Sequence, residues 1–254
     1  MDLSVPAVTL VGLLLATCRA AGFVLLAPPF NSSGIPAAAK GALVLALSVA
    51  LVHNVTPGLP APTPGFLIVT SLTEVAIGAG LGFVVQLLFT AVQMAGDILD
   101  VTGGFSLQPA YDPLAMTMTS NIGRLHYMLA SALLFTSGGD LMLVRGFATS
   151  YQALPVGAAL PTGQLAQVLM TALSMMFLAA LQIAGPMVAV LLLADVALAL
   201  LSRASPALNI FQLGFPVKIM LTLTMLGLSF PLLPTALDTL MEQATRAMIS
   251  LKGG

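Results

Sequence analysis

Asp97 and Asp100 are the two residues whose spacing comes nearest to a catalytic pair in this chain. They lie one helical turn apart at the end of an apolar segment, so both carboxylates would share one helix face. The pair has no partner acid, base or metal ligand, and the sequence holds no GxSxG, HExxH, phosphate-binding loop or GxGxxG motif. We therefore predict that the chain is not an enzyme.

The remaining metal-binding residue types are equally sparse. Cys18, His53 and His126 have no ligand spacing, so no metal and no cofactor is predicted. The net charge is −1 and there are only 8 Lys and Arg residues, without a basic cluster. Because binding to phosphate backbones depends on clustered cations, we exclude nucleic acid as a partner.

The two aspartates belong to a polar stripe, which is more informative than their spacing alone. At 100° per residue, five polar side chains fall within a narrow arc of the apolar segment 66–99 and its end. They are Gln86, Thr90, Gln93, Asp97 and Asp100. Such a stripe indicates either the wall of a pore or a contact with another subunit. The alternative is a set of hydrogen bonds between packed helices of the same chain.

The elements that carry these residues are those of a membrane protein. Hydrophobic residues make up 58% of the chain, charged residues 7%, and the mean hydropathy is +1.05. Soluble domains carry about 25% charged residues. Residues 146–194 form a run of 49 residues without Asp, Glu, Lys or Arg, whereas one bilayer span takes about 20.

We predict a series of helices, because the apolar segments are rich in Leu, Ala and Val and lipid leaves no partner for unpaired backbone groups. The segments are 7–27, 35–52, 66–99, 125–136, 141–154, 165–201 and 215–233, followed by a more polar helix over 235–251. Gly138-Gly139 should separate two short helices, and Pro186 should kink the longest one. Helices that are short, broken or longer than one bilayer span are not those of a simple bundle of straight helices.

Several charges lie in or beside these apolar segments, where each costs roughly 2.5–3.5 kcal/mol at the bilayer centre. They are Arg19, Glu74, Asp97, Asp100, Asp195 and Arg203. We expect them to pair with one another, to contact another subunit or to line water. For Arg19 and Arg203 the alternative is that each lies near a helix end and extends its head group toward water.

Two irregular segments join the helices. Residues 103–124 begin with Gly103-Gly104 and hold two prolines, so they cannot be helical throughout, yet they carry Phe, Leu, Tyr and Met side chains. An apolar loop of this length is usually functional, and the alternative is a buried connector. Residues 201–218 hold two prolines, an Asn and two charges, which predicts a structured turn between two helices.

The second segment closely resembles the signature of the FliR family of flagellar type III export proteins, which is related to SctT. The resemblance lies in Ser205, Pro206, Leu208, Asn209, Ile210, Phe211, Gly214, Phe215, Pro216 and Lys218. The stretches from Glu74 to Phe83, Gln93 to Gly96 and Gly104 to Ser106 also match, as do Asp112-Pro113 and 153–157. Where many relatives carry an Asn-Gly-His turn, this chain has Ser137-Gly138-Gly139-Asp140.

The resemblance implies an all-α membrane-type fold of broken and kinked helical hairpins. It implies a single export-gate domain in which a FliP-like portion (about 1–160) is followed by a FliQ-like hairpin (about 161–254). Relatives of this kind assemble in one copy with several FliP and FliQ subunits into a helical spiral, with FlhB associated. The implied location is the bacterial inner membrane in the flagellar basal body, largely raised toward the periplasmic side.

The resemblance also implies functional residues. The loop after Gly104 would be the plug that closes the channel, with Phe105, Leu107, Tyr111, Met116 and Met118 as its candidate residues. The polar stripe would face the lumen or a neighbouring subunit. The motif residues are Pro206, Asn209, Phe211, Gly214, Phe215, Pro216 and Lys218. The chain would contact exported flagellar proteins and membrane lipid and would bind no cofactor.

The alternative function is a stand-alone secondary transporter. Asp97, Asp195 and the kink at Pro186 would then form an ion site near the middle of the bilayer. Such a transporter usually holds an internal repeat between its halves, and the sequence shows none.

Overall fold

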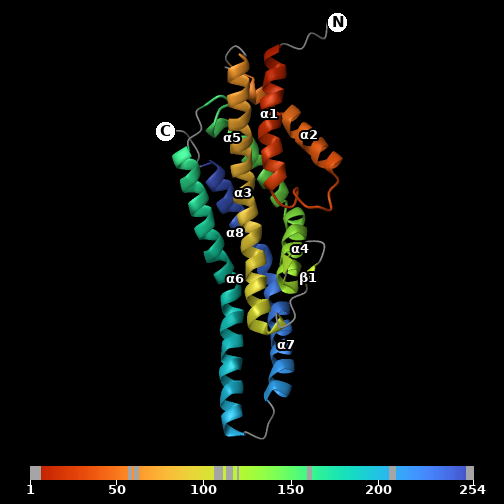
Figure 1. Cartoon of the computed structure of the whole chain (residues 1–254), viewed down its shortest axis with the longest axis vertical. Coiled ribbons are helices and arrows are strands. Elements are labelled where there is room, and N and C mark those ends of the chain that lie inside the picture. Colours follow the sequence, from red (N-terminus) through yellow and green to blue (C-terminus); the bar gives the residue numbers. More distant parts are fainter. Residues whose placement is uncertain are drawn as a thin grey trace. The chain divides into compact units, whose positions relative to one another are not determined.

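The structure is a computed structural model that describes residues 7–56, 59, 63–105, 111–112, 117–118, 120–158, 162–205 and 210–249. Helices make up nearly all of these residues (Figure 1). They are α1 (Ala7–Leu26), α2 (Ala37–Val55), α3 (Pro64–Gly103), α4 (Asn121–Thr136), α5 (Gly139–Ala153), α6 (Thr162–Ala204), α7 (Ile210–Ser229), the 3-10 helix η2 (Phe230–Leu232) and α8 (Leu233–Ile249). The predicted all-α membrane-type fold is confirmed.

The helix ends follow from local chemistry. Pro36 precedes α2, and Pro64 opens α3, where a missing N–H costs nothing. Ser120 is the N-cap of α4, and its Oγ accepts the Gly123 N–H at 2.8 Å. Gly138 separates α4 from α5 with a φ of 76°, a left-handed conformation that favours glycine. The predicted break at this glycine pair is therefore confirmed.

Two helices are longer than one bilayer crossing requires, as predicted. Helix α3 has 40 residues and α6 has 43, and α6 continues through Pro186. Among the described residues, 4 helical segments are long and apolar enough to cross a membrane, and α4 with α5 would make a fifth if together they form one broken span. The chain therefore has the helices of a multispanning membrane protein.

The chain divides into two compact units. The first comprises residues 1–88, 138–173 and 240–254, and the second comprises residues 89–137 and 174–239. Helices α3 and α6 each contribute one part to the first unit and one part to the second.

In the first unit, α1 packs against the N-terminal part of α3 at very short range. Gly22 of α1 faces the backbone of Val75 and Ala79, and Gly82 of α3 faces the carbonyl of Phe23. A Cβ atom added to Gly78 would collide with the backbone carbonyl of Arg19. The Gly78-to-Gly82 spacing is therefore a close-packing motif in this chain, as its small-residue pattern indicates. Helix α2 packs along the other side of α1 (Figure 1).

We expect Gly78→Ala to destabilise this crossing by about 1–3 kcal/mol, because the added methyl group meets backbone that cannot rotate away. Gly41→Ala is the matched control in the same unit: nothing lies within 4 Å of its would-be Cβ, so helix propensity should stabilise α2 by about 0.5–1 kcal/mol. Unfolding can be followed in detergent with a thiol-reactive dye, since Cys18 of α1 is the chain's single cysteine. Equal unfolding temperatures for the two variants would contradict the tight crossing.

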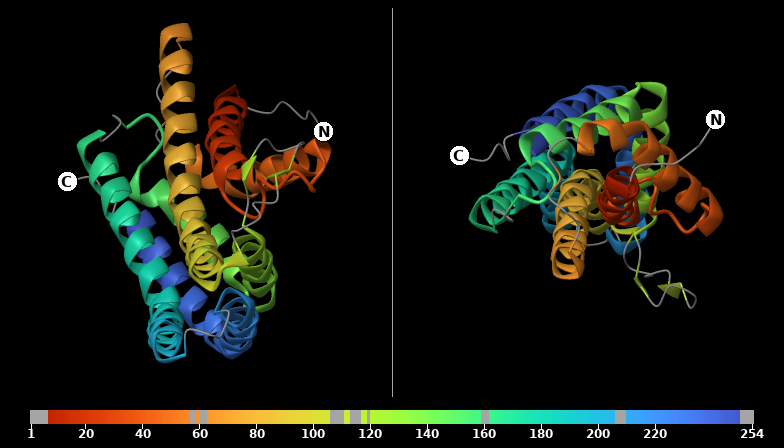
Figure 2. Two further views of the ribbon diagram at one scale, coloured as in Figure 1. Left: turned by 60° about the horizontal axis from the view of Figure 1, so that its bottom comes forward. Right: turned by 90° about the horizontal axis from the view of Figure 1, so that it is seen from above.

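In the second unit, the C-terminal part of α3 packs with α4, α6 and α7. Its core cluster consists of Leu99, Ile122, Met187, Leu191 and Leu226, with Phe105 packed against it. Helix α7 runs back alongside the C-terminal part of α6, forming a helical hairpin (Figures 1 and 2).

Glycines again allow the closest contacts in this unit. Gly96 of α3 faces the backbone of Ile122 and Gly123 in α4, and Gly103 faces the side chain of Thr222 in α7. The same unit carries a short antiparallel ribbon that the sequence did not predict. Strands β1 (Tyr111–Asp112) and β2 (Thr117–Met118) pair Tyr111 with Met118 and Asp112 with Thr117. Tyr and Thr favour extended backbone.

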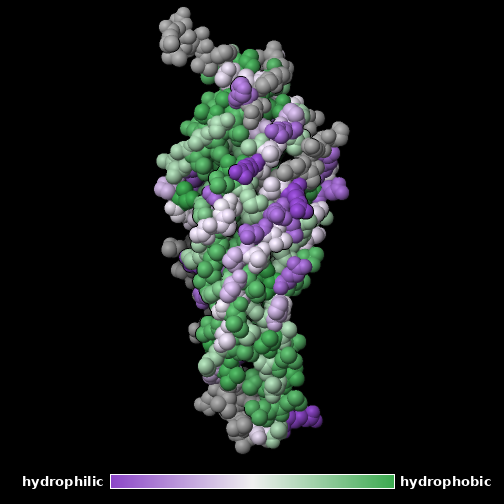
Figure 3. Space-filling view, turned by 180° about the vertical axis from the view of Figure 1, so that it is seen from behind, coloured by the Kyte–Doolittle hydropathy of each residue, from purple (hydrophilic) through white to green (hydrophobic). Residues whose placement is uncertain are grey.

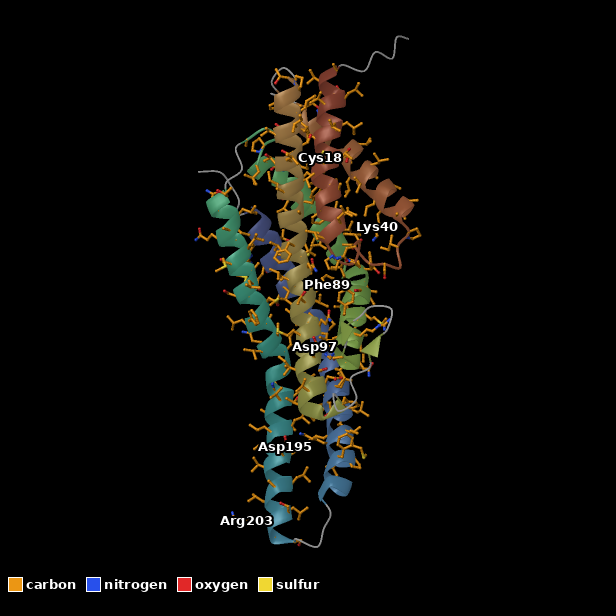
Figure 4. The ribbon with its side chains drawn as sticks, viewed as in Figure 1. Cys18, Lys40, Phe89, Asp97, Asp195 and Arg203 are labelled. Carbon is orange, nitrogen blue, oxygen red and sulfur yellow. The ribbon has the colours of Figure 1, made fainter. Side chains whose placement is uncertain are left out.

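Much of the apolar surface points outward. In α6, the residues Met170, Leu181, Leu192, Leu193 and Leu200 are each exposed by more than 60%. The surface of the α6–α7 hairpin is mostly hydrophobic in Figure 3, and Arg203 lies at its tip in Figure 4. Exposed apolar area of this extent marks a surface that contacts lipid or other protein chains.

Candidate functional site: charged clusters on apolar helices

Arg19 of α1 lies at the centre of a buried polar cluster in the first unit. Its Nε atom is 2.5 Å from Oε2 of Glu74 in α3. Its Nη2 atom donates to the carbonyl of Leu154 at 2.9 Å, and its Nη1 atom is 3.4 Å from Oγ of Ser150. The guanidinium carbon lies 4.1 Å from the ring centroid of Tyr151. The side chains of Arg19 and Glu74 are 0% and 1% exposed.

This geometry decides between the two interpretations of Arg19. The interpretation that it extends toward water is wrong, because the side chain is fully buried, and the expected pairing with another charge is confirmed. The guanidinium meets one carboxylate, one carbonyl, one hydroxyl and one aromatic face, so most of its donors are used. Arg203, in contrast, is exposed at the end of α6.

The Arg19 cluster joins three parts of the chain: α1, α3 and the C-terminal end of α5. The aromatic rings beside it continue the contact, since Tyr151 meets Phe147 edge-on and Phe147 stacks on Phe23 of α1 at 4.8 Å between centroids. The Tyr151 hydroxyl donates to the Ala16 carbonyl at 3.3 Å. The cluster therefore fixes how these helices pack.

We expect Arg19→Met to destabilise the chain by about 3–5 kcal/mol, because it leaves the Glu74 carboxylate buried without its counter-charge. The double variant Arg19→Met with Glu74→Leu should recover most of that loss, since an apolar pair replaces both charges. Arg246→Ala is the control: its pair with Glu242 is exposed on both sides, so little should change. The thiol-dye unfolding assay measures these three variants and the single variant Glu74→Leu.

If the losses from Arg19→Met and Glu74→Leu simply add in the double variant, the ion pair does not hold the two helices together.

The five residues of the polar stripe lie along α3 as predicted, but none is well exposed in the chain. Gln86, Thr90, Gln93 and Asp97 are half-buried, and Asp100 is buried. The two acidic residues of the stripe have neighbours within the second unit. A lumen-facing or subunit-facing role for the stripe stays a prediction.

Asp97 and Asp100 lie against the N-terminal turn of α4. Asp100 Oδ1 accepts the Ile122 N–H at 3.4 Å, the Asp97 carboxylate lies against Gly123, and the Ser120 hydroxyl bonds to Asp97. Carboxylates at this position satisfy free N–H groups and meet the positive end of the helix dipole, which contributes about 0.3–1 kcal/mol each. The expected hydrogen bonds between packed helices are therefore present for this part of the stripe.

His126, which sequence reasoning considered only as a metal ligand, lies next to this pair on α4. It is fully buried, and its Nδ1 atom is 3.0 Å from the Ile122 carbonyl. The imidazole and the Asp97 carboxylate interact electrostatically. The signal that could have found His126 is its spacing of three residues from Gly123, which places both on the same face of α4. Among the residues that the structure describes, no group of acidic, His or Cys side chains could hold a metal ion.

Asp195 of α6 pairs with Lys218 of α7. Lys218 Nζ lies 2.7 Å from Asp195 Oδ1, and the side chains of Lys218 and Asp195 are 21% and 48% exposed, respectively. The pair joins α6 to α7 within the hairpin, and Figure 4 shows Asp195 on α6. Lys218 is the last residue of the sequence motif that begins at Ser205, so one motif residue has an ion-pair partner in the structure.

Three other motif residues lie in the first turns of α7. Gly214 is buried, Pro216 lies inside the helix, and the Phe215 ring approaches Gly104 at the end of α3. Gly104 has a φ of 83°. The start of α7 thus packs where the chain leaves α3. Phe211 belongs to α7, whereas its side chain, Pro206 and Asn209 lie outside the described residues.

The candidate plug residues are placed only in part. Phe105 packs against the core cluster of the second unit. Tyr111 and Met118 face each other in the β1–β2 ribbon, and their side chains lie outside the described residues, as do Leu107 and Met116. Their role as a plug stays a prediction.

Comparison with known protein families matches residues 10–244 to the bacterial export proteins, family 1. The chain belongs to this family. The match covers most of every helix in both units.

Individual relatives agree over most of the chain. The flagellar biosynthetic protein FliR of Escherichia coli is 30% identical over 219 residues, which cover 85% of this chain and 82% of the relative. FliR of Bacillus subtilis is 28% identical, covering 84% and 83%. The surface presentation of antigens protein SpaR of Salmonella typhimurium is 32% identical, covering 91% and 90%.

Proposed function

We propose that this chain is a structural subunit of the flagellar type III protein export gate, located in the bacterial inner membrane as part of the flagellar basal body. The observation that carries the proposal is the family match over residues 10–244, together with FliR relatives aligned over most of their length. The Gly214-Phe215-Pro216 ending of the motif supports the flagellar rather than the virulence branch. The subunit would contribute to the channel wall for unfolded flagellar proteins and would catalyse no reaction.

The proposed partners are several copies of FliP and FliQ and the associated FlhB, with one copy of this chain. The outward apolar surface of the α6–α7 hairpin supports such contacts. Asp195 is half-exposed on that surface, and a carboxylate facing lipid is costly whereas one facing a polar partner is not. In this proposal the FliQ-like hairpin (about 161–254) follows a FliP-like portion (about 1–160), and the assembled spiral lies toward the periplasmic side.

Native mass spectrometry of the tagged chain, co-expressed with FliP, FliQ and FlhB and extracted in detergent, tests the proposal directly. The expected result is a discrete complex with one copy of this chain and several copies of FliP and FliQ. Arg246→Ala is the control, because its exposed pair lies on the polar face of α8 and should leave the complex intact. A stable monomer or homodimer that ignores these partners would instead favour the stand-alone transporter.

We also propose that the loop between α3 and α4 closes the channel. Its position after the end of α3 and its apolar side chains support this role. Replacing residues 106–119 by a Gly-Ser linker keeps Phe105 and the Ser120 cap, so both helices should still form. We expect cells that carry this variant in the assembled gate to leak ions, measured with a membrane-potential dye.

The matched control is a Gly-Ser replacement of residues 159–161, a second connector between helices, which should not leak. Unchanged membrane potential in a loop variant that still assembles would contradict the plug.

A further inference from the structure

Helix α8 differs from α6 and α7 in how its charged and polar residues are arranged. Its exposed polar residues recur at three- and four-residue intervals, so they share one face of the helix. They are Thr235, Asp238, Thr239, Glu242 and Arg246. The buried residues form the opposite face and are each between 1% and 4% exposed: Leu233, Leu237, Leu240, Met241 and Ala244. The protein itself therefore covers the apolar face of α8, and the polar face points away from it.

Helix α7, which precedes α8 along the chain, presents an apolar surface instead. Met220, Leu223 and Leu228 are 70%, 52% and 63% exposed. The 20 residues of α7 extend over about 30 Å at 1.5 Å per residue, which is the thickness of the hydrocarbon core of a bilayer. Helix α7 alone is therefore long enough and apolar enough for one crossing, which would end near η2.

Length and apolar composition alone would instead treat Gly214–Arg246 as one candidate span of 33 residues. The arrangement of charge argues against placing its second half in lipid. Glu242 and Arg246 pair with each other at 3.2 Å, yet their side chains remain 61% and 81% exposed. Hydrocarbon offers such groups no hydrogen bonds, and the apolar face of α8 has nothing to gain from lipid because it is already buried.

We propose that the crossing ends at η2 and that the polar face of α8 contacts water when the chain is in its membrane assembly. The α6–α7 hairpin then presents its exposed leucines to lipid or to partner helices, and α8 presents its charged side chains to the aqueous phase. This inference goes beyond the proposed function, because it names the surface that this chain exposes to water. It does not depend on which partner subunits are present.

Thiol labelling tests the proposal in membranes from cells that make the chain together with its partners. Cys18→Ala removes the chain's single cysteine, and one new cysteine is then introduced as Glu242→Cys or Leu228→Cys. The side chain of Glu242 is 61% exposed and Leu228 is 63% exposed, so a difference in labelling rate reports on their surroundings. We expect a charged, water-soluble maleimide to label Glu242→Cys at least about tenfold faster, because the reactive thiolate is disfavoured in hydrocarbon.

Arg246→Cys is the second variant, because Arg246 lies one turn further along the same face and should be labelled equally fast. A maleimide with a long polyethylene glycol chain distinguishes two sources of water: an open compartment admits it, whereas a narrow water-filled space admits only the small reagent.

Equal labelling rates for Glu242→Cys and Leu228→Cys would overturn the proposal. So would slow labelling of both Glu242→Cys and Arg246→Cys, which lipid or a partner subunit lying on this face would cause. Neither result depends on the composition of the complex found by native mass spectrometry, so the failure of this inference and the failure of the proposed function are distinguishable.

Discussion

The burial of charge in apolar helices is the constraint on which this structure depends. An arginine such as Arg19 cannot be buried alone, because transferring an unpaired charge out of water costs far more than one helix contact returns. The chain meets this constraint with a carboxylate from α3, a carbonyl and a hydroxyl from the end of α5, and an aromatic face. Three segments far apart in sequence are thereby forced into one arrangement.

That arrangement in turn requires small residues. The Glu74 carboxylate reaches the Arg19 guanidinium only if α1 and α3 run close together, and the glycines at 22, 78 and 82 remove the side chains that would hold them apart. The same combination recurs in the second unit. Gly96 and Gly123 bring α3 and α4 together, and Asp100 and Ser120 accept free N–H groups of α4 at that contact. Close approach and polar pairing thus depend on each other.

The sequence predicted the helices better than the partners of their side chains. Apolar segments, prolines and glycines define where helices begin and end, and these signals are local, as at Gly138 and Pro64. The pairing of Arg19 with Glu74 spans 55 residues, and the contacts with Ser150 and Leu154 span more than 130. The periodicity of apolar residues along a chain carries no information on contacts between residues so far apart in sequence. The same holds for His126, because the helix that it packs against begins 62 residues earlier, at Pro64. It also holds for the β1–β2 ribbon, because its strands are too short to show an alternating pattern.

The two kinds of charged site also differ in what they require from outside the chain. The Arg19 cluster is fully buried, and the Arg19 guanidinium finds its partners within the first unit. The Asp195–Lys218 pair is partly exposed on an apolar hairpin, so its remaining donors and acceptors face whatever covers that hairpin. Hydrocarbon offers no hydrogen bonds, whereas the polar edge of another helix does. A chain that keeps one charged site closed and leaves another open on its apolar surface is therefore suited to be one subunit of a larger membrane assembly.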